Sequence, residues 1–120
     1  MFVLFLIVNV LIIYGSIYPF DFVAVDLTAE RMERLLDTIW CGVRPGDLLG
    51  NVILFVPLGF FGCFAMARRG RAKAGTVMVL VWGLFLGVGL QVVQLYLPSR
   101  VPALDDAIWN LLGTGLGAAA

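Results

Sequence analysis

Histidine is absent from this chain of 120 residues, and only two cysteines, Cys41 and Cys63, are present. Without histidine the chain lacks the commonest general base and metal ligand, which excludes histidine-dependent catalytic triads and zinc hydrolases. Two widely spaced cysteines are too few for a disulfide framework or a zinc site. Cys63 lies inside an apolar run, where an inert buried thiol is expected. The sequence therefore implies no metal and no cofactor.

Charge is also scarce, because only 13% of the residues are charged whereas 62% are hydrophobic. Eight basic and eight acidic residues give a net charge of zero, which leaves no broad cationic surface for nucleic acid. A soluble domain of this size is closer to half apolar, since it must cover its surface with polar side chains. The apolar excess predicts a membrane protein whose first partner is the lipid bilayer. Nothing in the sequence indicates an oligomeric state.

What the sequence does contain is four apolar runs, at about residues 2–18, 48–67, 74–97 and 104–120. A helix that spans a bilayer needs about 20 residues. We therefore predict an all-α, polytopic bundle of four spanning helices that forms a single domain over residues 1–120. No basic residue precedes the first run, which favours a retained helix over a signal peptide. The last run is short, so its helix begins near Ala103 or the natural chain continues further.

The polar segment between the first two runs contains a short amphipathic pattern. Thr28 can cap its first turn, and apolar residues then recur at helical spacing opposite charged ones. The apolar residues are Met32, Leu35, Leu36, Ile39 and Trp40. We predict a short helix that lies along the membrane interface, with Trp40 at headgroup depth. An ordinary amphipathic connector packed on the bundle is the alternative.

The distribution of basic residues predicts which loops face the cytoplasm. The loop from Arg68 to Lys73 has four basic residues and no acid, whereas residues 19–47 have three basic and six acidic residues. The positive-inside rule places Arg68–Lys73 in the cytoplasm of a bacterial inner (plasma) membrane. Four crossings then put both termini in the cytoplasm, and the first loop and the loop around Arg100 face outward.

With this orientation, most of the unexplained polar residues gather near the outer leaflet. Asp47 and Asn51 are one turn apart at the start of the second run, and Gln91 and Gln94 share the end of the third. The remaining residues, from the last loop and the fourth run, are Arg100, Asp105, Asp106 and Asn110. Polar groups at this depth are costly and normally face the bundle interior. We therefore predict one outward-facing polar pocket.

Two interpretations of this pocket are open. In the structural one, Arg100 pairs with Asp106 or Asp47, the amides bridge helices, and the two adjacent aspartates favour a helix N-terminus. In the functional one, the same residues bind an anionic or carbohydrate headgroup. An arginine together with several carboxylates at one depth is more than helix packing needs, which favours binding.

Small residues repeat at a spacing of four on the last two runs. Gly83 and Gly87 form one such pair, and Gly113 and Gly117 form another. Pairs of this kind let neighbouring membrane helices approach closely. We assign these glycines to helix packing.

These residues together resemble the VanZ-like family. The resemblance rests on the exit Tyr18-Pro19-Phe20 and on the pattern Asp47-x3-Asn51-x3-Phe55-x-Pro57-x-Gly59, Gln94, Arg100-x5-Asp106-x3-Asn110-x2-Gly113-x3-Gly117. It covers nearly the whole chain. The resemblance implies a small multi-helix bacterial membrane protein, and the family's namesake confers low-level resistance to the glycopeptide antibiotic teicoplanin.

One departure from the family pattern concerns catalysis. The family usually has an acid three residues before the glutamine that is Gln94 here. This chain has Gln91 at that position, and an amide cannot shuttle a proton.

Three hypotheses about the function follow from the sequence. The first is a cell-envelope protein that binds a lipid-linked or peptidoglycan-precursor headgroup and alters antibiotic susceptibility. The second is an intramembrane enzyme with Asp106 as general base, and the third is a structural or assembly protein without a ligand.

Overall fold

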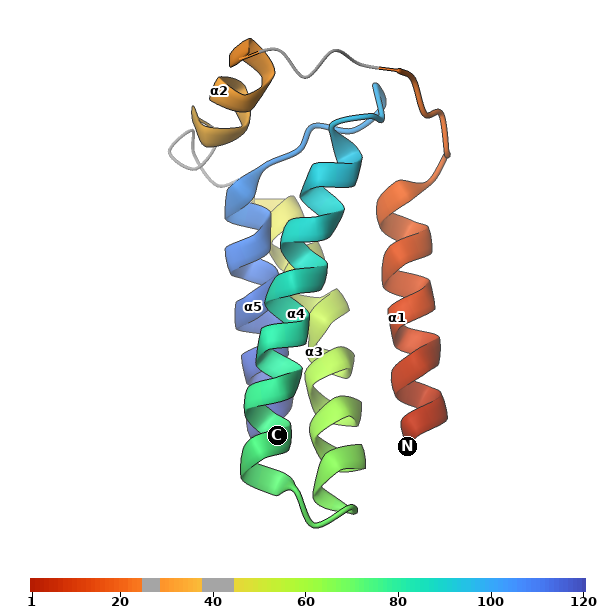
Figure 1. Ribbon diagram of the computed structural model, residues 1–120, viewed down its shortest axis with the longest axis vertical. Coiled ribbons are helices and arrows are strands. Elements are labelled where there is room, and N and C mark those ends of the chain that lie inside the picture. The colour runs from red at the N-terminus through yellow and green to blue at the C-terminus, as the bar shows by residue number, and fades with distance from the viewer. Residues whose placement is uncertain (25–28, 38–44) are drawn as a thin grey trace.

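A computed structural model describes residues 1–24, 29–37 and 45–120 of the chain. Within these ranges the chain is all-helical, as predicted, and has no strand. The helices are α1 (Phe2–Ile17), α2 (Ala29–Asp37), α3 (Pro45–Ala67), α4 (Ala72–Gln94) and α5 (Leu104–Ala119). Figure 1 shows α1, α3, α4 and α5 running along the long axis of the molecule, with α2 at one end.

The predicted boundaries need three corrections. α3 begins at Pro45 rather than near 48, because proline at the first helical position leaves no hydrogen bond unmade. α4 begins at Ala72 rather than at 74, and it ends at Gln94 rather than at 97. Leu97 precedes a proline and is thereby disfavoured in a helix, so the chain tightens into turns over the last residues. The short helix predicted in the first loop is present as α2, but Thr28 and Trp40 lie outside the described residues.

The surface of the bundle is strongly apolar. The segments Leu48–Ala67 and Ala72–Gln94 are long and apolar enough to cross a membrane, yet only 28% and 33% of an apolar 18-residue stretch in each is buried. On α4, for example, Val81 and Phe85 are 62% and 68% exposed. Apolar surface of this extent is typical of contact with lipid rather than water. These helices indicate a membrane protein. α1 is apolar but shorter, so the four predicted crossings stay a prediction.

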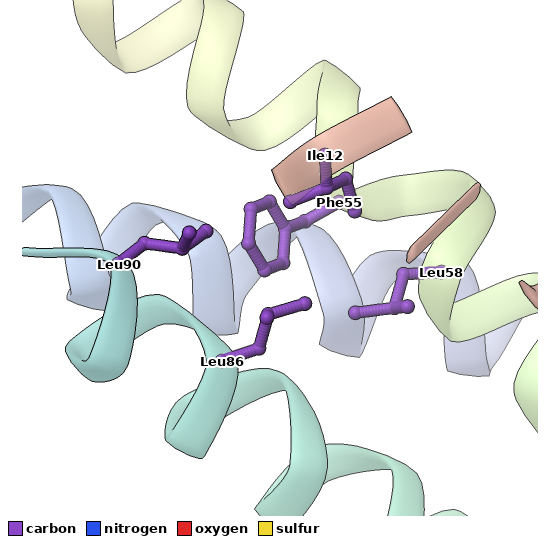
Figure 2. Close-up of a cluster of buried hydrophobic side chains, with 5 residues drawn as sticks. All are labelled: Ile12, Phe55, Leu58, Leu86 and Leu90. Carbon is purple, nitrogen blue, oxygen red and sulfur yellow. The ribbon is translucent and has the colours of Figure 1, made fainter. Parts of the chain in front are cut away.

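The core lies where α1, α3 and α4 meet. Its buried members are Ile12 from α1, Phe55 and Leu58 from α3, and Leu86 and Leu90 from α4. Figure 2 shows these five side chains pointing toward one another. Ile12 and Leu58 are fully inaccessible to solvent, although α1 is otherwise mostly exposed. The core therefore attaches α1 to α3 and α4.

Glycines bring α5 into close contact with α3. A Cβ atom added at Gly113 would overlap the carbonyl oxygen of Val52, and one added at Gly117 would overlap that of Val56. The contact also runs in the other direction, because a Cβ at Gly59 would overlap the carbonyl oxygen of Thr114. The two backbones therefore touch along about two turns of α3. No larger residue fits at these positions unless the helices move apart.

Glycines on α4 face the same helix from its other side. A Cβ at Gly83 would stand 2.5 Å from the hydroxyl oxygen of Thr114, and one at Gly87 would stand 3.3 Å from the Cβ of Asn110. α5 therefore packs closely against α3 on one face and against α4 on another. This arrangement holds Asn110 and the residues one turn before it in a fixed position.

The two ends of the bundle differ in chemistry. We call the end with Arg68, Arg69, Arg71 and Lys73 the basic end, and the opposite end, where α3 and α5 begin and α4 ends, the polar end. Both termini lie at the basic end, and α2 lies at the polar end (Figure 1).

Candidate functional site

A pocket of about 440 Å³ opens at the polar end, between α1, α3, α4, α5 and the loop that joins the last two. Its apolar lining includes Leu54 and Leu90. Six of the eight polar residues predicted from the sequence line it: Asn51, Gln91, Gln94, Arg100, Asp106 and Asn110. Residues separated by up to 59 positions in the chain are thus brought together, since α3 and α5 begin where α4 ends.

Two of the predicted residues are placed differently. Asp105 is half-buried and does not line the pocket, and its buried Oδ1 has no hydrogen-bond partner among the described residues. It lies in the first turn of α5, where a negative charge is favourable. Asp47 lies in the first turn of α3, but its side chain is outside the described part of the structure.

Arg100 fastens the loop before α5 to the C-terminal end of α1. Its Nη2 donates hydrogen bonds to the carbonyl oxygens of Gly15 (2.8 Å) and Tyr18 (3.0 Å), and its Nε donates to Tyr18 (3.1 Å). The last carbonyls of a helix have no donor within the helix, so the guanidinium acts as a cap. These bonds use two of its three nitrogens. Nη1 has no hydrogen bond within the described residues, and Arg100 lines the pocket.

The two glutamines of α4 bind backbone groups on either side of the pocket. Gln94 Nε2 donates to the carbonyl oxygen of Ser16 at 3.0 Å, which adds another bond at the end of α1. Gln91 Oε1 accepts a hydrogen bond from the backbone N–H of Ala103 at 2.8 Å. Gln91 is 3% exposed, so this bond is sheltered from water. Both amides fix the walls of the pocket through the backbone, not through other side chains.

Asn110 differs from these residues because its side-chain oxygen is unsatisfied. The residue is 2% exposed and lines the pocket, yet Oδ1 has no hydrogen-bond partner among the described residues. An unpaired buried acceptor costs about 1–3 kcal/mol. The side chain packs beside Gly87, where an added Cβ would stand 3.3 Å from Asn110 Nδ2. The wall of the pocket therefore contains an asparagine whose buried side-chain oxygen is unpaired among the described residues.

Several residues of the site could not be found from side-chain chemistry. The carbonyl oxygens of Gly15 and Tyr18 bind Arg100, but any residue type carries a carbonyl. Ser99 lines the pocket and donates from its hydroxyl to Asp21 Oδ1 at 2.8 Å. Val23 N–H donates to the carbonyl oxygen of Tyr96 at 3.0 Å. The segment after α1 is thus tied to the rim of the pocket. In the sequence, the only indication of this link is that Ser99 and Asp21 lie in two loops on the same predicted side of the membrane and can form a hydrogen bond.

The family model described as VanZ/LLP1 matches residues 2–120, which is essentially the whole chain. The chain belongs to the VanZ/LLP1 family. The resemblance predicted from the sequence is thereby confirmed. Among the residues that carried it, five line the pocket of this VanZ/LLP1 protein: Asn51, Gln94, Arg100, Asp106 and Asn110. Gly59, Gly113 and Gly117 make the α3–α5 contact. No curated protein and no solved structure matches the chain.

Proposed function

We propose that this VanZ/LLP1 protein crosses the inner membrane of a bacterium four times and binds the headgroup of a lipid-linked or cell-wall precursor in its polar pocket. The observation that carries the proposal is the content of the pocket. Arg100 and Asn110, each with one side-chain atom that has no partner in the described residues, line the same cavity.

The proposed orientation has the polar end outside and the basic end in the cytoplasm. The positive-inside rule supports this, and so does the position of both termini at the basic end, since an even number of crossings requires them on one side. α1 and α5 have 16 residues each, or about 24 Å at 1.5 Å per residue. Helices of this length can span a bilayer that thins locally around them.

The pocket chemistry limits the class of ligand. Arg100 Nη1 offers a charged donor, which suits a phosphate or carboxylate oxygen. Asn110 Oδ1 offers an acceptor, which suits a hydroxyl or an amide N–H. A headgroup that combines an anionic oxygen with hydroxyl or amide donors satisfies both. Sugar phosphates and peptide-bearing precursors are of this kind.

An effect on glycopeptide susceptibility would follow from such binding. A membrane protein that holds a precursor headgroup on the outer face changes how much of that precursor an antibiotic in the same place can reach. The support for teicoplanin in particular is the family's namesake. This part of the proposal depends on binding and is tested after it.

A structural role is the second candidate, and a specific observation favours it. Arg100, Gln91 and Gln94 all bind backbone groups of the protein, so these three stabilise the fold whether or not a ligand is present. Catalysis by Asp106 is supported only by its place in the pocket, and Gln91 stands where the family pattern has an acid.

The decisive experiment replaces Asn110 by leucine, which has the same number of side-chain heavy atoms and the same branching, and removes the unpaired oxygen. Binding of a labelled lipid-linked precursor to the purified protein in detergent is measured, together with abundance in the membrane. We expect unchanged abundance and binding that is weaker by roughly ten-fold, equivalent to one lost hydrogen bond. Thr76→Val, which removes a hydroxyl near the basic end, is the matched control and should bind normally.

Three outcomes decide between the candidates. Binding by the unaltered protein that Asn110→Leu weakens supports the headgroup pocket. Absence of binding by the unaltered protein, with loss of folded protein in Arg100→Ala, favours the structural role and overturns the proposal. Release of a product from the labelled precursor would instead establish an enzyme, and Asp106→Asn should then abolish that release.

A further inference from the structure

A second cavity lies near the basic end of the bundle and is entirely different in character. It is a groove of about 370 Å³ between α1, α3 and α4. The residues that line it are apolar and include Phe2 and Phe5 from α1, Met66 from α3, and Met78 and Trp82 from α4. Phe5 also packs against the core cluster, so this part of the lining is continuous with the core. None of these residues belongs to the polar pocket.

The groove lies beside an uncompensated positive charge. The guanidinium carbon of Arg69 stands 5.1 Å from the ring centre of Phe2, and Phe2 lines the groove. Arg68 is likewise placed over an aromatic ring, that of Phe64, at 5.9 Å. Residues 1–20 and 48–104 contain no aspartate or glutamate, so no acidic side chain from α1, α3 or α4 beyond residue 47 neutralises these arginines. Basic side chains at this position attract anionic lipid.

We propose that the groove is a binding site for one anionic phospholipid of the cytoplasmic leaflet, with an acyl chain between α1 and α4 and the headgroup at Arg69. The combination of an apolar channel and a cation beside it matches a molecule that carries an anion at one end and a hydrocarbon chain behind it. The two methionines can adapt to a chain of variable shape. A diffuse attraction between the basic loop and anionic lipid would not require the groove. Dependence on the groove therefore distinguishes a specific lipid site from such an attraction.

Trp82 provides a direct reporter, because it lines the groove. The other two tryptophans are replaced in the variant Trp40→Phe/Trp109→Phe, and the full chain is reconstituted in phosphatidylcholine vesicles. Phosphatidylglycerol with brominated acyl chains, which quench tryptophan in contact with them, is then added in steps. We expect quenching of Trp82 at a mole fraction about five-fold lower than for brominated phosphatidylcholine, the preference that one nearby basic residue confers.

The position of the anion is tested by Arg69→Gln, with Lys73→Gln as the matched control. Both residues are exposed, so neither change endangers folding. The preference for phosphatidylglycerol should fall to nearly equal quenching in Arg69→Gln and change little in Lys73→Gln. Equal losses in the two variants would indicate a diffuse surface attraction and overturn the site. Equal quenching of the unaltered reporter by both lipids would overturn it as well.

The groove itself is tested by Ala65→Phe, which adds a ring to one of its walls. Quenching by both brominated lipids should decrease, while circular dichroism and gel-filtration behaviour stay unchanged. Unchanged quenching in this folded variant would show that no chain enters the groove. None of these measurements involves the polar pocket, so their result is independent of the proposed precursor binding.

Discussion

Asn9 Oδ1 accepts a hydrogen bond from Trp82 Nε1 at 2.7 Å, which joins the middle of α1 to α4. The other half of the amide is also used, because Asn9 Nδ2 donates to the carbonyl oxygen of Phe5 at 2.7 Å. Asn9 is 8% exposed, so both bonds replace water that the site excludes. The pair fixes the position of α1, which supplies one wall of both cavities.

We expect this pair to show energetic coupling. Asn9→Leu and Trp82→Phe each leave one buried group without its partner, whereas the double variant leaves neither. The free energies of unfolding, measured in detergent micelles, should give a coupling of about 1 kcal/mol, typical of hydrogen bonds between membrane helices. If the two losses simply add, the bond contributes nothing to the stability of the bundle.

A second prediction concerns the contact between α3 and α5. Gly117→Ala places a methyl group against the carbonyl oxygen of Val56, so the helices must separate, at a cost of about 1–3 kcal/mol. Gly115→Ala is the control on the same helix, because the nearest atom, Leu80 Cδ2, is 4.0 Å from the added carbon. The control should be neutral or stabilising, since alanine favours helix. Equal thermal stability of the two variants would contradict the close contact.

Much of the fold could be predicted because the apolar runs are long and separated by charge. The all-α class and the helices at both sides of the Arg68–Arg71 turn follow from this contrast alone. The ends of the helices were less predictable. Hydropathy extends to Leu97, but Pro98 disfavours a helical residue before it and α4 ends at Gln94. Local backbone chemistry, which composition does not record, set that boundary.

The candidate site was predictable to the extent that polar side chains are costly in a membrane. That rule selects Gln91, Gln94 and Arg100, and each lines the pocket. It could not select their partners, because Arg100 binds the carbonyl oxygens of Gly15 and Tyr18, which no side-chain pattern identifies. Nor could it identify the bond between Asn9 and Trp82, since a lone asparagine in an apolar run has many possible partners. The sequence indicated which polar side chains need hydrogen-bond partners, and the packing of the helices determined what those partners are.

Gln91 supports the start of α5, and its replacement distinguishes hydrogen bonding from proton transfer. Gln91→Leu leaves the N–H of Ala103 without an acceptor and should lower the free energy of unfolding by about 1–3 kcal/mol. Gln91→Glu retains an acceptor oxygen and restores the acid of the family pattern. It should unfold at nearly the same denaturant concentration as the unaltered protein. A larger loss for glutamate than for leucine would show that the pocket rejects a second negative charge beside Asp106.

Arg100 should resist replacement by lysine, because its contribution depends on geometry as well as charge. One ammonium group cannot reproduce the planar fork that reaches Gly15 and Tyr18 together. Arg100→Lys should therefore cost about 1–2 kcal/mol of stability, as expected for losing charge-assisted hydrogen bonds, and should speed hydrogen exchange in the last turn of α1. Arg71→Lys, an exposed change at the basic end, is the matched control and should alter neither quantity. If exchange in α1 is as slow in Arg100→Lys as in this control, the guanidinium does not cap the helix, and its role in the pocket reduces to its charge.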